Sequence, residues 1–264
     1  MSRSWSCSML VITVLACLAF GAHAAHAQIV NVQAALAKPP EHDGQGGQVE
    51  GKISWLEGNN PLFDIGGSGA FLIRRSNLIG LAVARGEYGT SRGVLLTKKT
   101  FEHIRLRSLL EGGWRWEWFA QHEFDQFRRL SLRAVTGTGP AYQFFGSKEV
   151  EVLGGIAYIY EDERLDARSG TIDAGKHSVA HRVSAYVTGH QDLSKTASIV
   201  ETVYAQPRID APSDIRILGE LSVQTKLTSR IALKDTFNVA YDASPPDGVR
   251  TYDTLLEVSV IVTF

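Results

Sequence analysis

Residues 114–124 read Trp-Arg-Trp-Glu-Trp-Phe-Ala-Gln-His-Glu-Phe, and their side chains alternate between two kinds. Trp114, Trp116 and Trp118 fall on one face of an extended chain, whereas Arg115 and Glu117 fall on the other. Successive side chains of a strand point to opposite faces, so this period of two predicts a strand between two environments. A soluble core rarely takes three tryptophans in register, because buried indole N–H groups need partners, whereas a lipid interface is enriched in them. We therefore predict one strand of an outer-membrane barrel, with the tryptophans facing lipid and the charges facing the lumen.

The first 27 residues have the pattern of an export signal. A short polar segment contains Arg3, an apolar run covers residues 9–20, and Ala25-His26-Ala27 offers a small-residue cleavage site. The run is shorter than the roughly 20 residues that a membrane helix needs. We predict that residues 1–27 are a signal peptide cleaved before Gln28. A lipoprotein signal ending at Cys17 is the alternative, and residues 25–27 offer the better site.

Composition excludes several classes of site. Both cysteines, Cys7 and Cys17, lie inside the predicted signal. The mature protein should therefore contain no disulfide, thiolate metal site or cysteine nucleophile. The formal net charge is −1, so no field of the whole chain indicates a nucleic-acid partner. Charges interrupt every later apolar stretch, which excludes a membrane helix but is usual for the alternating strands of a barrel.

The remaining chain divides into two predicted parts. Residues 28–47 contain an apolar patch, Ile29–Leu36, then Pro39-Pro40 and three glycines, and we interpret them as a periplasmic N-terminal linker; a leader without a role is the alternative. Residues 48–264 are predicted to form an all-β, transmembrane, antiparallel up-and-down barrel of about twelve strands. The strands should begin near residues 49, 63, 77, 94, 114, 130, 150, 177, 197, 215, 231 and 251.

Connections of two lengths separate these segments. Short turns are predicted around residues 75–76, 111–113, 146–148 and 227–229, and longer polar connections at 86–92, 161–176, 207–214 and 242–248. Short periplasmic turns that alternate with longer outer loops are typical of an outer-membrane barrel. Residues 125–129 are short for an outer loop and residues 189–195 are long for a periplasmic turn. Asp235 falls on the apolar face of its segment, which predicts a bulge or a misplaced boundary.

The C-terminal strand has the pattern of an assembly signal. Apolar side chains alternate back from the terminal residue, at Leu256, Val258, Val260, Val262 and Phe264. A terminal phenylalanine on such a strand resembles the signal that the outer-membrane assembly machinery reads. The expected partners are therefore this machinery, periplasmic chaperones, and the lipid and lipopolysaccharide of the cell outer membrane. No nucleic acid is expected, and the sequence leaves the oligomeric state open.

Two blocks, residues 99–105 (Lys-Thr-Phe-Glu-His-Ile-Arg) and residues 118–125 (Trp-Phe-Ala-Gln-His-Glu-Phe-Asp), are followed by Arg128-Arg129-Leu130. Together they resemble a bacterial domain-of-unknown-function family of salt-induced outer membrane proteins. The resemblance is sharpest over residues 98–142 and continues diffusely from residue 30 to residue 264. It implies a barrel fold and an outer-membrane location, without an activity or any catalytic or ligand residue. The long acidic connection at residues 161–173 departs from the usual pattern of the family.

The richest titratable cluster is Glu102, His103, His122, Glu123 and Asp125. These residues could hold a divalent metal or form an Asp–His pair that activates water, or they could be polar groups satisfied by arginines. By strand parity His122 and Glu123 point to opposite faces, so both enter one site only at a bulge. The His-Ser pairs at 177–178 and at 181 and 184 match no triad motif. We therefore predict no metal, no cofactor, no catalytic residue and no enzyme activity.

Charged residues on the predicted inward face should form a lumen charge network. They are Arg105, Arg107, Arg115, Glu117, Glu123 and Arg133. They could form a cationic constriction that selects anions or an ion-pair network that fills a narrow barrel, and we favour the network because buried charges need partners. An Arg115→Ala protein should then unfold more easily without gaining conductance. The acidic residues at 161–173 are interpreted as a solvated loop, with binding of calcium or of lipopolysaccharide phosphates through cations as the alternative.

Two functions are compatible with this reading. One is a non-enzymatic outer-membrane barrel that contributes to envelope integrity or to the response to salt or osmotic stress, as the family resemblance implies. The other is a narrow small-solute channel that prefers anions. About twelve strands enclose only a narrow lumen, since open porins use about sixteen.

Overall fold

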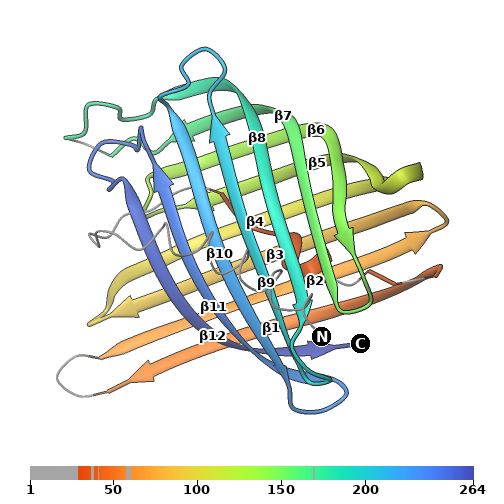
Figure 1. Ribbon diagram of the computed structural model, residues 1–264. Coiled ribbons are helices and arrows are strands. Elements are labelled where there is room, and N and C mark those ends of the chain that lie inside the picture. The colour runs from red at the N-terminus through yellow and green to blue at the C-terminus, as the bar shows by residue number, and fades with distance from the viewer. Residues whose placement is uncertain (1–28, 37–38, 41, 58–60, 169) are drawn as a thin grey trace, which may run out of the picture.

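The structure is a computed structural model that describes residues 29–36, 39–40, 42–57, 61–168 and 170–264. Twelve strands close into one antiparallel barrel, in which each strand pairs with its neighbours in sequence and β1 pairs with β12 (Figure 1). The predicted up-and-down barrel is therefore confirmed. The predicted signal peptide, residues 1–27, lies outside the described residues.

The bounds of the elements follow the alternating pattern of the sequence. The strands are β1 (Gly44–Leu56), β2 (Leu62–Arg75), β3 (Leu78–Ser91), β4 (Val94–Leu109), β5 (Trp114–Asp125), β6 (Leu130–Gly146), β7 (Val150–Leu165), β8 (His177–Asp192), β9 (Ala197–Pro207), β10 (Ile215–Lys226), β11 (Ile231–Asp242) and β12 (Tyr252–Thr263). Within the described part of the chain, two short helical pieces, α2 (Gln33–Leu36) and η1 (Glu111–Gly113), accompany them. Each strand from β4 to β11 begins at the predicted residue.

One end of the barrel, here named the turn end, carries the connections that follow β2, β4, β6, β8 and β10, each of two to four residues. The other end, the loop end, carries the longer connections at residues 166–176, 208–214 and 243–251. The prediction of a long connection at 86–92 is wrong, because β3 continues to Ser91 and only Arg92 and Gly93 separate it from β4. The long turn predicted at 189–195 is also wrong, because β8 continues to Asp192. The connection at residues 126–129 is short, as predicted.

The closure between β1 and β12 is the shortest pairing in the barrel. Four register pairs join these strands, from Gln48↔Thr263 to Gly51↔Val260. Next to them, the backbone N–H groups of Gly47 and Phe264 each donate to the carbonyl of the other residue, at 3.0 and 2.9 Å. The two ends of the barrel sequence therefore hold each other at the turn end.

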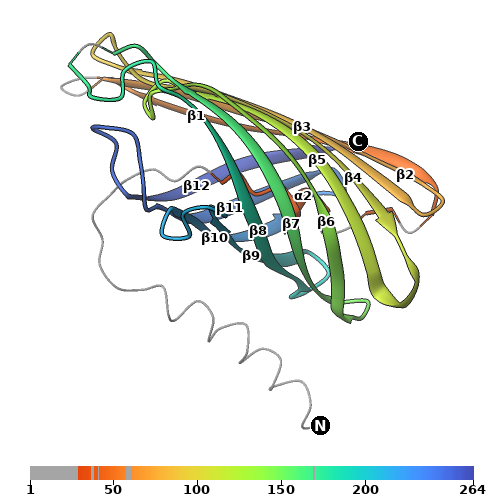
Figure 2. The same ribbon diagram turned by 90° about the horizontal axis from the view of Figure 1, so that it is seen from above.

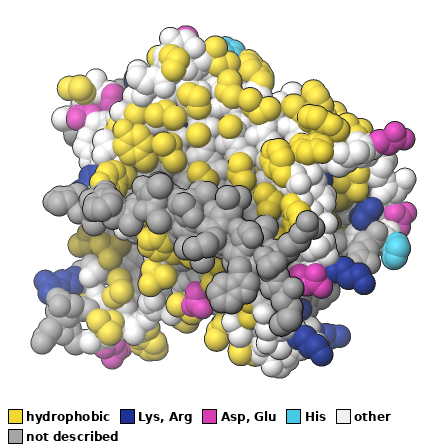
Figure 3. All heavy atoms as spheres, in the orientation of Figure 1, with side chains coloured by type: hydrophobic (Ala, Val, Ile, Leu, Met, Phe, Trp, Pro, Cys, Tyr) yellow, Lys and Arg dark blue, Asp and Glu magenta, His cyan; other side chains and the backbone are white. Residues whose placement is uncertain are grey.

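The outer wall is mainly apolar, and the lumen contains most of the charged side chains of the strands together with apolar inward side chains such as Ile79, Leu81 and Val83 of β3. Trp114, Trp116 and Trp118 lie outside with 51, 38 and 44% of their surface exposed, and hydrophobic side chains cover much of the wall in Figure 3. The Trp116 indole N–H donates to Thr138 Oγ1 at 2.9 Å. Asp235 faces outward in regular register with Val223 and Val258, so the predicted bulge is absent. No helix among the described residues is long and apolar enough to cross a membrane.

The N-terminal segment differs from the predicted periplasmic linker over residues 28–47. β1 already begins at Gly44, so the barrel starts before the predicted residue 48. Residues 29–36 are largely buried, and Figure 2 shows α2 inside the ring of strands. An apolar patch of the chain is thus covered by the barrel instead of lying outside it.

Candidate functional site in the barrel lumen

Glu161 is the centre of the largest ion-pair cluster in the lumen. This residue lies on β7, is 2% exposed, and accepts hydrogen bonds from Arg133 on β6, Arg182 on β8 and Arg216 on β10. The distances are 2.8 Å from Arg133 Nε, 3.3 Å from Arg182 Nε and 2.7 Å from Arg216 Nη1. Because β7 and β10 are three strands apart, the cluster joins separated parts of the wall.

More carboxylates surround the same arginines. Arg216 Nη2 lies 3.0 Å from Glu163 Oε2, and Arg216 Nε lies 3.0 Å from Asp242 Oδ2. Arg133 Nη1 lies 3.3 Å from Glu123 Oε2. Each of these two guanidinium groups therefore has more than one carboxylate, which offsets part of the cost of removing a charge from water. The resulting network extends from β5 to β11.

A second cluster surrounds Glu117 on β5. Arg105 Nη1 and Arg107 Nη2, both on β4, lie 3.2 and 2.6 Å from its carboxylate oxygens. From β8, the hydroxyl of Tyr186 donates to Glu117 Oε2 at 2.9 Å. Because β5 and β8 are not neighbours, the Tyr186 hydrogen bond crosses the lumen. This cluster therefore ties two distant parts of the wall together.

Arg115 lies apart from both clusters. Its guanidinium donates to Gln143 Oε1 at 2.5 Å and pairs with Glu151. The Glu151 side chain is 25% exposed, so this pair is less buried than the others. The structure therefore divides the six predicted lumen residues into three sets: Arg105, Arg107 and Glu117; Glu123 and Arg133; and Arg115 alone.

The N-terminal segment, residues 29–36, contacts the lumen wall through polar groups. Asn31 Nδ2 donates to Glu220 Oε1 at 2.9 Å, and Arg85 Nη2 donates to the Asn31 carbonyl at 2.9 Å. Arg107 Nη2 donates to Gln33 Oε1 at 3.1 Å, so the same arginine contacts both the segment and Glu117. The segment is thereby connected to the second cluster.

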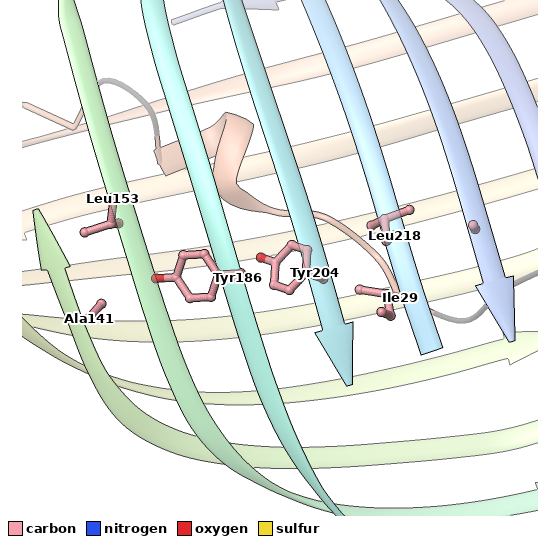
Figure 4. Close-up of a cluster of buried hydrophobic side chains, with 7 residues drawn as sticks. Ile29, Ala141, Leu153, Tyr186, Tyr204 and Leu218 are labelled. Carbon is pink, nitrogen blue, oxygen red and sulfur yellow. The ribbon is translucent and has the colours of Figure 1, made fainter. Parts of the chain in front are cut away.

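Apolar contacts hold both ends of the same segment. Val32 and Leu36 are 1 and 2% exposed and pack in one cluster with inward side chains of β2, β3 and β4, namely Leu72, Ile79, Leu81, Val83 and Phe101. Ile29 packs in another cluster that includes Tyr186, Tyr204 and Leu218 (Figure 4). The segment therefore covers apolar surface on two sides of the lumen.

A cavity of about 30 Å³ remains beside Ile29 and Val30. Its lining includes Arg105, His103 and Tyr204, and the His103 Nδ1 atom and the Tyr204 hydroxyl are buried without a protein hydrogen-bond partner. This space holds about two water molecules, which would satisfy such groups. With the segment in place, the cavity is too small for a solute larger than a few atoms.

The titratable cluster predicted around His122 is divided by the wall. Glu102 and His122 face outward, where His122 Nδ1 lies 2.5 Å from Glu102 Oε2. His103, Glu123 and Asp125 face inward and are buried. Within the described ranges, no group of three or more histidines and carboxylates is placed to hold a metal ion.

The acidic segment predicted as a solvated loop at residues 161–173 is a loop only from Asp166 onward. Glu161 and Glu163 belong to β7 and face the lumen. Asp173 accepts a hydrogen bond from Arg129, and Arg129 Nε also lies 3.0 Å from Asp166 Oδ1. The correction follows from the length of β7, which continues the alternation through the acidic run.

Arg129 joins three connections at the loop end, and we name Arg129, Asp166, Asp173 and Asp247 the loop clasp. The arginine is 1% exposed and has a φ of +61°, and its Nη1 donates to the Asp247 carbonyl at 2.9 Å. The Asp247 N–H donates to Asp173 Oδ2 at 2.8 Å. Burial raises the pKa of Asp173, but the hydrogen bonds from Asp247 and Arg129 outweigh it and hold the pKa below its usual 3.8.

Breaking the loop clasp should loosen the connection at 166–176 and allow its backbone to enter a protease active site more often. An Asp173→Asn protein loses a charge-assisted pair, and we expect trypsin to cut after Arg168 about tenfold faster than in the parent at neutral pH. The matched control is Asp210→Asn, which removes the separate pair with Arg208 in the connection at 208–214. Equal cutting rates in the parent and the Asp173→Asn protein would contradict the clasp.

The loop clasp should also respond to acid. Because the pKa of Asp173 is lowered by folding, its contribution is fully present above pH 3.8 and is lost as the pH falls through the lower pKa of the folded state. Pepsin, which works in acid, should therefore cut the parent faster as the pH falls below 3.8, and Asp173→Asn should show a weaker dependence.

The fold and the lumen define a class of protein: a closed antiparallel barrel with an apolar outer wall, a charged interior and unequal connections at its two ends, as in outer-membrane barrels. A family model matches residues 53–264, which is more than half of the chain. The chain belongs to this family, which is described as "Protein of unknown function, DUF481". A comparison with curated proteins found no match.

Several solved barrels are similar in fold. The COG4313 outer membrane channel from Pseudomonas putida F1 is 12% identical with a TM-score of 0.50, covering 86% of this chain and 99% of that one. The NanC porin is 11% identical with a TM-score of 0.46, covering 83 and 97%. The KdgM porin is 9% identical with a TM-score of 0.41, covering 84 and 99%. At these identities the similarity concerns the fold alone.

Sequence reasoning missed two features of the lumen. The acidic composition predicts a loop at Glu161, whereas the alternation of Ile159, Glu161 and Glu163 with outward residues is the signal that places it on the inward face. The insertion of residues 29–36 had a weaker signal, which was the apolar patch before Pro39. An apolar patch of this kind is expected to be buried, but the sequence does not indicate which surface it packs against.

Proposed function

We propose that this protein is a non-enzymatic outer-membrane barrel, closed at rest, that contributes to envelope integrity under salt or osmotic stress. The observation that carries the proposal is the filled lumen: two ion-pair clusters connect strands that are not neighbours, and residues 29–36 occupy space between the walls. The role in stress is taken from the resemblance to the salt-induced family. A rigid, plugged barrel fits a structural role better than steady transport.

The apolar outer wall supports the proposed location. The predicted assembly residues Leu256, Val258, Val260, Val262 and Phe264 all lie exposed on the outward side of the C-terminal strand. In the proposed orientation, the turn end faces the periplasm and the loop end faces outward. The export signal, the chaperones, the assembly machinery and the contacts with lipopolysaccharide belong to the same proposal.

We expect the protein to fractionate with the outer membrane and to migrate differently on gels before and after heating, because a closed barrel resists detergent until it is heated. Membrane fractionation with heated and unheated samples is the measurement. Recovery as a soluble periplasmic protein would contradict the proposed outer-membrane location.

A narrow anion-preferring channel is the second candidate. One observation favours it: the segment at 29–36 is not part of the wall. If the segment left the lumen, Arg105 and Arg107 would become accessible to solutes. Recordings of the full chain in planar bilayers separate the two candidates. We expect no steady conductance from the full chain, whereas a stable open pore with anion preference would establish the channel instead.

A further inference from the structure

We propose that the lumen contains a binding site for a short peptide with carboxamide side chains, and that residues 29–36 are its tethered occupant, whose release opens the barrel. This inference rests on the proposed closed barrel, and it names residues 29–36 as the segment that closes the lumen. Three groups recognise the polar part of the segment: Arg85, Arg107 and Glu220.

The polar recognition is complementary in charge and direction. The guanidinium groups of Arg85 and Arg107 donate to carbonyl oxygens of the segment, whereas the Glu220 carboxylate accepts from the Asn31 amide. Asn31 uses its amide N–H as a donor and Gln33 uses its amide oxygen as an acceptor, so each carboxamide meets one charged partner, whereas the Gln33 Nε2 atom is buried without a hydrogen-bond partner among the described residues. Within the segment, the Gln33 N–H donates to Asn31 Oδ1 at 2.9 Å, which fixes the local bend.

Apolar side chains of the segment pack against a stripe of apolar side chains on the lumen wall. The inward side chains Leu72, Ile79, Leu81, Val83 and Phe101 would face water in an empty barrel, next to the charged groups of the lumen. Val32 and Leu36 cover this stripe and are nearly fully buried in return. Burial of apolar surface therefore favours the occupied state, although the segment does not pair with any strand of the wall.

The segment is attached in a way that allows exchange. Among the described residues, its backbone makes no backbone-to-backbone hydrogen bond with a strand of the barrel. Its polar contacts with the wall are side-chain hydrogen bonds, and the chain continues toward β1 at the turn end, where Arg74 Nη1 donates to the Pro40 carbonyl at 2.8 Å. Release therefore requires no break in the strand ladder.

The experiment compares the full chain with a variant that lacks residues 29–36 but keeps Gln28. In planar bilayers, we expect no conductance from the full chain and an open state from the deletion variant. A synthetic peptide with the sequence of residues 29–36 should then block the variant when added from the turn end. The control is the same peptide with alanine in place of Asn31 and Gln33, which should block at least about tenfold more weakly because it loses two hydrogen bonds to charged groups.

Several outcomes would overturn the inference. A folded deletion variant that stays closed would show that the ion-pair clusters alone close the barrel, and the proposed function would survive. Equal block by both peptides would show that Asn31 and Gln33 are not recognised. If the deletion variant fails to fold, as judged by heat-dependent gel migration, the full-length Asn31→Ala/Gln33→Ala protein replaces it. That protein should open transiently. The absence of any conductance, as in the parent, would overturn the inference.

Discussion

Replacing Glu161 with glutamine should lower the free energy of unfolding by about 3–5 kcal/mol, because it leaves buried guanidinium groups without their shared carboxylate. Arg133, Arg182 and Arg216 all donate to this residue, and its side chain is 3% exposed. The substitution keeps the shape of the side chain, so the effect reports charge and not volume. Unfolding in urea with the barrel in lipid vesicles, followed by tryptophan fluorescence, is the measurement.

Two controls make this result specific. Arg115→Ala should cost less, about 1–2 kcal/mol, because Arg115 pairs with the partly exposed Glu151 outside the two clusters. Asp210→Asn should change stability little, since its pair with Arg208 lies in an exposed connection. If the free energy of unfolding of Glu161→Gln equals that of the parent, the lumen is hydrated and its ion pairs contribute little to stability.

The second large effect concerns assembly. Replacing both Val260 and Val262 with aspartate should strongly reduce the amount of folded barrel in the outer membrane, as should deletion of Phe264. Both valines face outward, and each lies at the short closure, in register with Gly51 and Val49 of β1. Carboxylates on a lipid-facing wall cost free energy that depends on depth. Immunoblots of heated and unheated outer-membrane fractions measure the folded amount.

The matched control is Thr254→Asp, which places the same charge on the outward face of β12 near the loop end, where the cost falls toward the membrane interface. This protein should accumulate nearly as well as the parent. Normal amounts of the doubly substituted protein would argue that the C-terminal strand is not read as an assembly signal.

The sequence by itself determined the wall of the barrel. Strand parity is a local property, so the alternation at residues 114–124 and in the C-terminal strand was enough to predict two faces. The same alternation located the start of every strand from β4 to β11. It failed where local composition suggested a loop, as at residues 86–92 and in the acidic run after Tyr160, although both continue a strand.

Only the tertiary structure decided which groups meet inside. Parity says that Glu161 and Arg216 both face inward, but these residues are 55 positions apart and on strands that do not pair, so their contact depends on the curvature of the closed barrel. The loop clasp around Arg129 likewise joins three separate connections. The insertion of residues 29–36 depends on an apolar stripe built from three strands, which exists only after the barrel has closed. Local periodicity fixes the direction of a side chain, whereas its partners across a lumen are set by long-range closure.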